Sequence, residues 1–389
     1  MRVTIVGWEY DDELVDETSL LDRYATLTGW SEALRSAGVE HVTVVHRFRR
    51  ESVVTRRGVT YCFCADRQGS RRVPWMGRLI SAVVASSPDV VHVNGLGFSP
   101  YTWWLRHRLA GSAALVVQDH AGGEPPTDGR LGLASFKLAV KRQLMRAADA
   151  YLFTALEQAV SWQAAGLIGD QQTILAIPEG STDLEPVDRA RAREVSGVSG
   201  HPAVLWVGRL NANKDPLCVI DGCARAWRER PGLTLSMIYS TDDLLGEVRY
   251  RVAAHPDFAR SVRLIGRVPF AALADYYSAA DVFVLGSHHE GSGYALVEAC
   301  ACGLPPAVTD IAPFRVLTGR GHIGRLWSPG NSEACASAIL ALSESATPTV
   351  RAEVRAHFER ALSWPAIGRQ ARSAYDALLR KRAGARQPG

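Results

Sequence analysis

The sequence predicts an α/β protein made of two doubly wound domains, each with a parallel sheet between layers of helices. Strand candidates and helix candidates alternate from one end of the chain to the other, which is the pattern of repeated βαβ units. The 389 residues also exceed what one core usually holds, because a prior of about one domain per 100–200 residues gives two. Hydrophobic residues make up 47% and charged residues 22%, which excludes a disordered or fibrous chain.

Short apolar runs rich in β-branched residues mark the strands of the first half. Such runs, bounded by Gly, Asp or Pro, are typical of parallel strands that are buried on both faces. Helical stretches lie between them, and one of these, Thr28–Ala37, ends at Gly38, a common helix stop. The expected strands are Val3–Val6, Val42–His46, Val59–Cys64, Val90–Val93, Ala114–Gln118, Ala150–Phe153 and Thr173–Ile177.

A second array of the same kind begins near residue 203. Its expected helices include Cys218–Arg230 and Tyr294–Cys302. The polar stretch Asp183–His201 is the expected linker. Its expected strands are Ala203–Val207, Leu233–Ile238, Val262–Ile265, Val282–Leu285 and Ala307–Thr309. We therefore expect an N-terminal domain over residues 1–183, a C-terminal domain over 184–364, and a last helix over 365–389 that crosses back to the N-terminal domain.

Charge, hydropathy and cysteine content exclude several classes of partner and site. The net charge is only +4, and no compact basic block with interleaved aromatic residues is present, so nucleic acid is not an expected partner. No apolar run approaches the roughly 18 residues of a membrane span. The seven cysteines are sparse, odd in number and without paired C-x-x-C knuckles, which favours buried thiols in a reducing cytoplasm over a zinc site or a disulfide framework.

The segment VLWVGRLNANKDP at 204–216 carries the first candidate site. A buried strand runs into Gly208, where the backbone can approach a ligand closely. Arg209 and Lys214 follow beyond the end of the strand, where two cations can hold a diphosphate. The alternative is a solvated loop that happens to contain two basic residues.

The segment VFVLGSHHEGSGYALVEA at 282–299 carries the second. Small residues at 291–293 would expose backbone N–H groups at the start of a helix, which favours an anion. Glu298 lies inside that helix and can accept hydrogen bonds from a sugar or ribose diol. The alternative for Glu290 is an acid that is stabilised by the helix dipole. The preceding His288 and His289 are expected to pack or fill the loop rather than bind a metal.

Together the two segments resemble the nucleotide-sugar glycosyltransferases of family 4, which have the GT-B fold of two Rossmann-like domains. Glu290 and Glu298 form the family's E-x7-E pattern, and Thr309-Asp310 is similar to its "TD" strand end. The resemblance implies a retaining transfer from a UDP- or GDP-sugar in the C-terminal domain to a small-molecule acceptor in the N-terminal domain. It implies no cofactor besides the nucleotide-sugar co-substrate.

The resemblance also implies roles for individual residues. Arg209 and Lys214 would hold the diphosphate, Glu298 the ribose hydroxyls, and Glu290 the donor sugar. His120 lies in a D-H-x-G segment similar to the family's, whose histidine lines the donor sugar near the anomeric carbon; the alternative is a cap in a loop. The implied catalytic residues are His120, Arg209, Lys214 and Glu290. The implied donor-binding residues are Gly208, Arg209, Lys214, Arg267, Val268, Glu290, Gly291, Ser292, Gly293, Tyr294, Ala295 and Glu298.

Some positions depart from the family. The loop Trp8–Leu21 is long and acidic instead of carrying a glycine pair, and it would either attract a cationic acceptor such as an amino sugar or be a solvated loop. Asn94 replaces the second histidine of the H-x-H that begins at His92, a pair with either an acceptor role or a structural one. Glu179 replaces the usual asparagine of P-N-G and is not assigned to the site.

No D-x-D pair is present to hold a divalent ion, so Arg209 and Lys214 would do the work of the metal. A lipid-linked or cell-envelope acceptor is the first alternative to a small molecule. A phosphorylase or a nucleotide-sugar epimerase could share the two-domain fold. A protein that binds a nucleotide sugar without transferring it is the alternative from another class.

Overall fold

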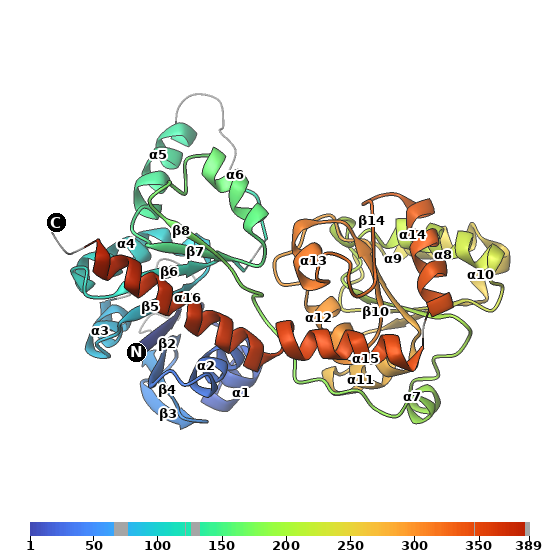
Figure 1. Ribbon diagram of the computed structural model, residues 1–389, viewed down its shortest axis with the longest axis horizontal. Coiled ribbons are helices and arrows are strands. Elements are labelled where there is room, and N and C mark those ends of the chain that lie inside the picture. The colour runs from blue at the N-terminus through green and yellow to red at the C-terminus, as the bar shows by residue number, and fades with distance from the viewer. Residues whose placement is uncertain (66–76, 121, 126–132, 346, 386–389) are drawn as a thin grey trace. The chain divides into compact units, whose positions relative to one another are not determined.

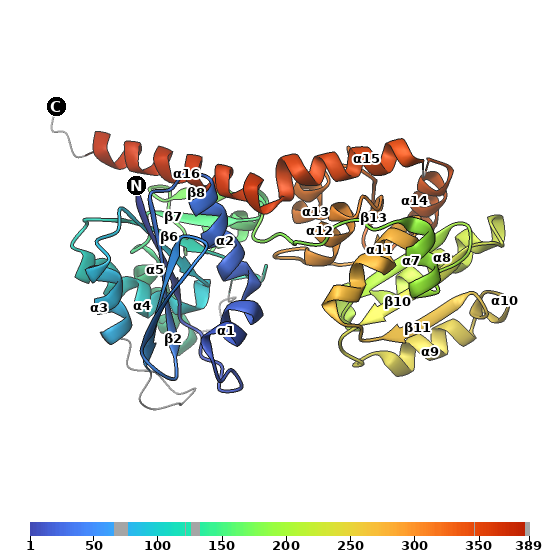
Figure 2. The ribbon, with the colours of Figure 1, turned by 90° about the horizontal axis from the view of Figure 1, so that it is seen from below.

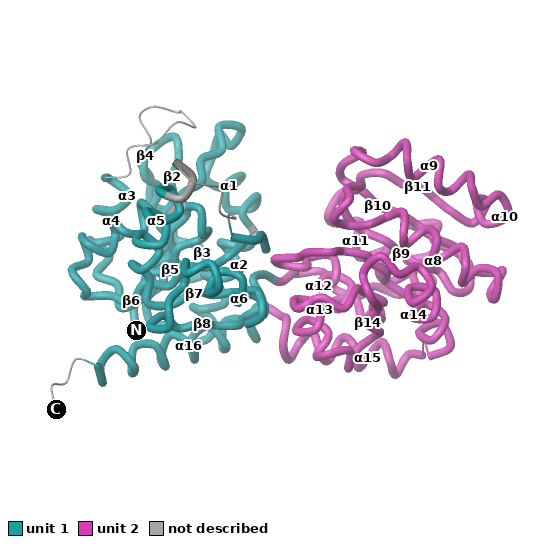
Figure 3. Tube along the Cα trace, turned by 90° about the horizontal axis from the view of Figure 1, so that it is seen from above, with its two compact units in different colours: residues 1–180, 364–389 teal, residues 181–363 magenta. Residues whose placement is uncertain are grey.

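The structure is a computed structural model that describes residues 1–65, 77–120, 122–125, 133–345 and 347–385 (Figure 1). The chain divides into two compact units (Figure 3). Unit 1 contains residues 1–180 together with 364–389, and unit 2 contains residues 181–363. Among the described residues, no helix combines the length and the apolar character that crossing a bilayer would need.

The sheet of unit 1 has the strand order β3-β4-β2-β1-β5-β6-β7-β8. Its described strands pair in parallel except β3, which is antiparallel to β4 at the edge. Each strand expected in this half is present, whereas the edge strand β3 was not expected. The strands are β1 (Arg2–Gly7), β2 (His41–Phe48), β3 (Ser52–Arg56), β4 (Val59–Ala65), β5 (Val90–Asn94), β6 (Ala114–Gln118), β7 (Ala150–Phe153) and β8 (Thr173–Ala176).

The central strands β5 and β6 are buried on both faces, so they are apolar at successive positions. Val90 belongs to the core on one face and Val91 to the core on the other. The helices of unit 1 are α1 (Glu17–Arg23), α2 (Ala25–Ser36), α3 (Gly77–Ala85), α4 (Ser99–Leu109), α5 (Leu133–Met145), α6 (Ala159–Ala164) and α16 (Trp364–Gly384).

The last helix, α16, belongs to unit 1 although it follows unit 2 in the sequence. It lies along α2 (Figure 2). A Cβ at Gly368 would approach the carbonyl oxygen of Ala33 to 2.2 Å, so only glycine permits this close approach of the two helices. Tyr375 is fully buried, and its hydroxyl accepts a hydrogen bond from Trp30 Nε1 at 3.3 Å. The fold of unit 1 therefore needs the end of the chain.

The sheet of unit 2 is parallel throughout its described strands, in the order β11-β10-β9-β12-β13-β14. The expected strands are present, and β14 is an addition. The strands are β9 (Ala203–Gly208), β10 (Thr234–Tyr239), β11 (Val262–Gly266), β12 (Val282–Leu285), β13 (Pro306–Thr309) and β14 (Arg325–Trp327). The helices are α7 (Arg189–Ser196), α8 (Pro216–Glu229), α9 (Leu245–Ala253), α10 (Pro256–Ala259), α11 (Leu273–Ala279), α12 (Tyr294–Ala301), α13 (Ala312–Leu317), α14 (Ser332–Ser345) and α15 (Pro348–His357).

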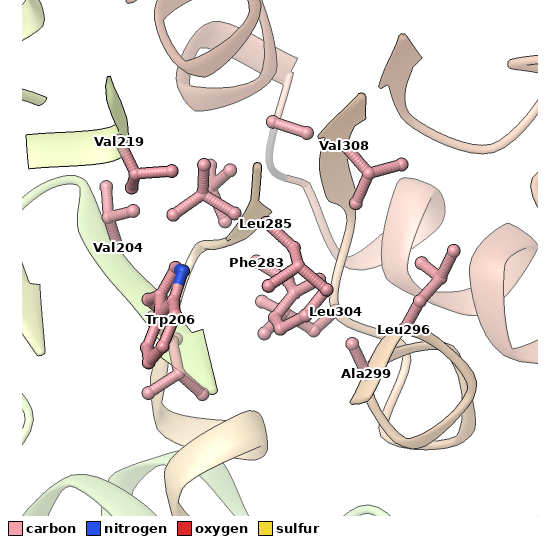
Figure 4. Close-up of a cluster of buried hydrophobic side chains, with 14 of the residues drawn as sticks. Val204, Trp206, Val219, Phe283, Leu285, Leu296, Ala299, Leu304 and Val308 are labelled. Atoms are coloured by element: carbon pink, nitrogen blue, oxygen red, sulfur yellow. The ribbon is translucent and has the colours of Figure 1, made fainter. Parts of the chain in front are cut away.

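The core of unit 2 fixes the two strands that lead to the candidate site. Trp206 of β9 and Phe283 of β12 are fully buried and belong to one cluster (Figure 4). Val219 from α8 and Leu296 from α12 also belong to this cluster. The helix that follows each strand is thereby packed on the same core as the strand itself.

The stretch 183–201 differs from the expected linker, because part of it folds as α7 and packs on α11. Asp281 fixes its place: this buried carboxylate accepts a hydrogen bond from the backbone N–H of Ala203 and forms ion pairs with Arg189 and Arg193 of α7. The arginines that give the segment its polar composition therefore anchor it to unit 2.

Strand order identifies where a ligand can bind in each unit. In open α/β sheets, ligands bind beyond the carboxyl ends of the strands, where the strand order reverses. In unit 2 this point lies between β9 and β12, and in unit 1 it lies between β1 and β5.

Candidate active site

In unit 2, the loop after β9 is shaped by its own side chains. Asn211 accepts a hydrogen bond from the backbone N–H of Lys214 at 3.1 Å and so closes a short turn over residues 212–214. Asp215 follows with a left-handed backbone (φ 40°) and caps α8 by accepting from the N–H of Cys218 at 3.2 Å. The polar residues of this loop therefore fix its backbone and place Lys214 at the end of β9.

Hydrogen bonds tie this loop to the one that follows β12. The side chain of Asn213 donates to the carbonyl oxygen of His289 at 2.9 Å and accepts from the N–H of the same residue at 2.9 Å. His288 Nε2 lies 3.1 Å from Asp215 Oδ2. The two histidines thus connect the loops that carry Lys214 and Glu290, a role that sequence reasoning did not assign to them.

Lys214 and Glu290 come together as an ion pair between Nζ and Oε1. Both side chains are largely buried, at 13% and 9% exposure. Ser287 Oγ donates to the same carboxylate oxygen at 2.7 Å. The structure therefore brings together two of the predicted catalytic residues, from segments far apart in the sequence, at the point where the strand order reverses.

Glu298 points from α12 into a buried environment. Burial raises the pKa of its carboxyl group to about 7, and a hydrogen bond from the Tyr277 hydroxyl to Oε2, 2.8 Å long, partly offsets that rise. Gly293 precedes the helix with a left-handed backbone (φ 64°), and a Cβ there would meet Leu317 at 2.7 Å. Tyr277 is a further polar contact of the site that the sequence did not reveal.

The other predicted donor-site residues lie at the carboxyl edge of the sheet or at the start of α12. Gly208 ends β9, and Arg209 follows as an exposed side chain. Arg267 and Val268 follow β11, two strands away from β9. The residues from Gly291 to Ala295 form the loop and first turn of α12.

In unit 1, a pocket of about 220 Å³ opens where the strand order reverses. It includes the residues that follow β1, those that end or follow β5, and side chains from β2 and the start of α2. The pocket is lined by Gly7, Trp8, Glu9, Tyr24, Thr26, Leu27, His46, Asn94, Gly95 and His120. The predicted residue His120 is therefore part of a pocket that lies within unit 1.

Glu179, which the sequence analysis left out, is the partner of His120. Its Oε1 lies 2.6 Å from His120 Nδ1, and its side chain is 4% exposed. Glu179 Oε2 and His120 Nε2 are both buried and without a hydrogen-bond partner in the described part of the chain. A carboxylate that replaces the family's usual asparagine was the available signal, but its contact with His120 spans 59 residues of sequence.

His46 is a second histidine of the pocket, buried in strand β2. Its Nδ1 lies 2.6 Å from the carbonyl oxygen of Arg47, so Nδ1 carries the proton and donates. Burial lowers the pKa of His46 to about 4, so the ring is neutral near pH 7. A Cβ at Gly7 would lie 2.2 Å from the His46 ring, so glycine is required beside it.

His92 takes the structural one of its two expected roles. It is fully buried, its Nδ1 contacts the Tyr375 hydroxyl, and its Nε2 lies 2.9 Å from Gln118 Oε1. Burial lowers its pKa to about 3. Asn94, two residues further along, lines the pocket.

The acids of the loop Trp8–Leu21 also have two kinds of role, some structural and one at the pocket. Asp16 caps α1 by accepting from Ser19 N at 2.8 Å. Glu17 pairs with Arg50 and accepts from Ser52, and these bonds lower its pKa to about 2. These two acids support the fold, whereas Glu9 lines the pocket.

Comparisons with known proteins find similar sequences among glycosyltransferases. Residues 201–345 match the family model "Glycosyl transferases group 1". D-inositol 3-phosphate glycosyltransferase from Segniliparus rotundus is 32% identical over 220 residues, or 54% of this chain and 48% of that protein. The protein of the same name from Kribbella flavida is 27% identical over 248 residues, or 61% of this chain and 56% of that protein. The chain thus spans about half the length of these curated relatives.

Solved structures share the fold over nearly the whole chain. Sucrose-phosphate synthase from Thermosynechococcus elongatus superposes with a TM-score of 0.67 at 18% identity, covering 98% of this chain and 99% of that one. Anabaena HepE in complex with UDP and glucose superposes with a TM-score of 0.67 at 16% identity, covering 96% and 99%. At this identity, the likeness establishes the two-domain GT-B fold.

Proposed function

Because residues 201–345 form a group 1 glycosyl transferase domain, we propose that the chain is a retaining glycosyltransferase. It would move a sugar from a nucleoside diphosphate sugar to a small-molecule acceptor. The observation that carries this proposal is the ion pair between Lys214 and Glu290. These residues lie on the loops that follow β9 and β12, and side-chain hydrogen bonds of Asn213 connect the two loops. Unit 2 would bind the donor and unit 1 the acceptor.

The diphosphate of the donor would lie beside Lys214 and Arg209. Negative charge grows on the diphosphate of the leaving nucleoside diphosphate as the bond to the sugar breaks, and fixed cations stabilise that charge most in the transition state. Lys214 is held at the strand end by its pair with Glu290. Arg209 directly follows β9 as an exposed side chain and could reach an entering phosphate. These two cations would replace a divalent metal.

The nucleoside would be held by Glu298. One of its carboxylate oxygens already accepts from Tyr277, and the carboxylate can accept further hydrogen bonds from the two hydroxyls of a ribose. Hydrogen bonds to the ionised carboxylate favour the charged form that burial penalises. Nucleotide binding and ionisation of Glu298 would therefore support each other.

His120 would stand on the acceptor side of the reacting bond. Glu179 fixes the orientation of its ring, so that Nε2 is the nitrogen left to meet a sugar hydroxyl or the attacking acceptor hydroxyl. Glu290 would contact the donor sugar, with Ser287 and Lys214 fixing its carboxylate. Attack on the same face as departure of the leaving group would give retention.

The names of similar proteins support the class of substrates. The curated relatives are named for transfer to D-inositol 3-phosphate, and a structural neighbour is described with UDP and glucose. We propose UDP or GDP as the nucleotide. All seven cysteines are free thiols, which supports a reducing cytoplasm as the location.

A donor screen tests the proposal. The full chain is heated with UDP, GDP, ADP and dTDP sugars, and the right nucleotide is expected to raise the melting temperature by binding the folded state. Transfer with that donor is then followed by release of the nucleoside diphosphate, and NMR reports the anomeric configuration of the product. Inverted stereochemistry would contradict the retaining mechanism, and the absence of both binding and transfer would contradict the function.

A further inference from the structure

We propose that the acceptor held in the unit 1 pocket is a polyhydroxylated ring that carries an amine and no phosphate. This inference rests on the proposed function, because it names the substrate class of the acceptor side. It departs from the acceptor for which the curated relatives are named, since D-inositol 3-phosphate is an anion. The ground for it is the set of hydrogen-bond acceptors and charges that the pocket presents.

His46 presents a lone pair to the pocket. Because Nδ1 donates to the carbonyl oxygen of Arg47, the neutral ring carries its proton there and Nε2 is left as an acceptor. Burial keeps the ring neutral near pH 7. His46 is only 2% exposed and lines the pocket, so a group that meets Nε2 must donate a hydrogen bond. A hydroxyl or an ammonium group can do so, whereas a phosphate dianion cannot.

The pair of His120 and Glu179 supplies no net positive charge in either protonation state. With a neutral imidazole, Nδ1–H donates to the carboxylate, Nε2 offers a second lone pair, and the pair carries a net negative charge. With an imidazolium, the pair is neutral overall. Glu179 is almost completely buried, so water screens its charge only weakly. In neither state does the pair supply the excess positive charge that a phosphate needs.

Glu9 adds a carboxylate at the pocket. It lies two residues beyond the end of β1 and is exposed, so an entering molecule can meet it. None of the lining residues that the structure describes is lysine or arginine. An ammonium group on the acceptor would gain a charge-assisted hydrogen bond to Glu9, which is about twice as strong as a neutral one.

The remaining walls suit a carbon ring with polar edges. Trp8 and Tyr24 supply aromatic surface, and Leu27 supplies aliphatic surface. Such surfaces can cover the C–H face of a six-membered ring, while hydroxyls at its edge reach Asn94 and the histidines. The volume of about 220 Å³ is adequate for one such ring.

Three closely matched ring compounds test the inference: scyllo-inosamine, scyllo-inositol and D-inositol 3-phosphate. Each is titrated into the full chain by calorimetry. The three are then offered together in one transfer assay with the donor from the nucleotide screen, and mass spectrometry counts the products. We expect scyllo-inosamine to bind at least about tenfold more tightly than scyllo-inositol, and the phosphate to bind most weakly.

The variant Glu9→Gln tests whether the preference for scyllo-inosamine over scyllo-inositol arises in the pocket. It is expected to remove most of the advantage of scyllo-inosamine over scyllo-inositol. Glu13→Gln is the matched control, because Glu13 is an exposed acid of the same loop that does not line the pocket. It is expected to keep the preference.

The outcomes separate this inference from the proposed function. Equal binding of the amine and the alcohol, or tighter binding of the phosphate, overturns the inference, and transfer to either compound would leave the proposed function standing. Binding of nucleotides without binding of any of the three rings also counts against it. Failure to bind nucleotides and to transfer to any acceptor overturns the proposed function itself.

Discussion

The candidate site of unit 2 and the pocket of unit 1 occupy equivalent places in their sheets but are built from different chemistry. Unit 2 joins a lysine to a carboxylate, and the exposed Arg209 follows the same strand as the lysine. The described lining of the unit 1 pocket contains two imidazoles and the carboxylate of Glu9 but no lysine or arginine, and one of the imidazoles, His120, pairs with the buried Glu179 behind it. Under the proposed function, the same place of the fold would bind a diphosphate in one unit and a polyol in the other, according to which side chains end the strands.

The largest expected effect is the loss of the unit 2 cation. Lys214→Ala should lower kcat/KM by about 30- to 1,000-fold, on the order of 2–4 kcal/mol of transition-state stabilisation, because the leaving nucleoside diphosphate loses a fixed positive charge beside it. Steady-state kinetics measure the loss. Lys381→Ala, which removes an exposed lysine that hydrogen-bonds Thr173 in unit 1, is the control and should be neutral. A loss below about tenfold would refute the role of Lys214.

A second variant separates charge from folding. Lys214→Ala also leaves Glu290 buried without its cation, which can destabilise the unit. The double variant Lys214→Met with Glu290→Gln removes both charges and should recover the melting temperature but not the activity. Recovery of both would show that Lys214 acts only on stability.

The next largest effect is the pH dependence of folding stability that Glu298 gives to unit 2. Burial raises the pKa of Glu298 to about 7 from 4.5 in the unfolded chain, so between these values the folded state keeps a proton that the unfolded state releases. The stabilising contribution is therefore complete below about pH 4.5 and is lost as pH rises through about 7, with a total on the order of 3 kcal/mol.

Thermal unfolding between pH 5 and pH 8 measures this contribution. The melting temperature of the native chain should fall relative to that of Glu298→Gln as pH rises. Glu333→Gln, which changes an exposed acid at the start of α14, should follow the native curve. Parallel curves for the native chain and Glu298→Gln would contradict the raised pKa.

In unit 1 the corresponding prediction concerns Glu179, the carboxylate that pairs with His120. Glu179→Gln keeps an oxygen that can accept from His120 Nδ1–H but removes the charge, so we expect kcat to fall about tenfold while nucleotide affinity is unchanged. Kinetics and a UDP titration separate the two quantities. Glu157→Gln, an exposed acid of the same unit, is the control. An unchanged kcat would make Glu179 a purely structural residue.

The smallest effect should come from removing the Asn213 hydrogen bonds that connect the two loops of unit 2. Asn213→Ala removes two hydrogen bonds, but the backbone bond from His288 N to residue 213 and the ion pair of Lys214 remain. We expect a rise of about three- to tenfold in KM for the donor. Asn331→Ala, at the start of α14, is the control, and equal effects of the two changes would remove the special role of Asn213.

The sequence predicted the sheets well because a buried parallel strand is visible as a local apolar run. It missed β3, whose residues Ser52–Arg56 alternate between half-buried and exposed at the sheet edge, and β14, which is only three residues long. It also read α7 as part of a linker, because the arginines that anchor this helix to Asp281 look like solvated residues in a one-dimensional pattern.

The two sites also differ in how far they could be predicted from the sequence. The residues that follow β9 and β12 form contiguous motifs, so Lys214, Glu290 and Glu298 could be predicted from the sequence as site candidates. The pocket of unit 1 draws Gly7, His46 and His120 from three separate segments. His46 lies within an apolar strand and resembles a core residue, and Glu179 acquires its meaning only through a contact with His120 across the fold.

The packing of α16 on α2 has a consequence for how the protein is made. Unit 2 is one continuous stretch, whereas unit 1 lacks a helix until α16, which follows unit 2 in the sequence, has left the ribosome. Synthesis runs from the N-terminus, and domains generally fold as units. Unit 1 is therefore translated first but completes its fold only after unit 2 has been made, and until α16 emerges its sheet lacks the contacts that Tyr375 makes with Trp30 and His92.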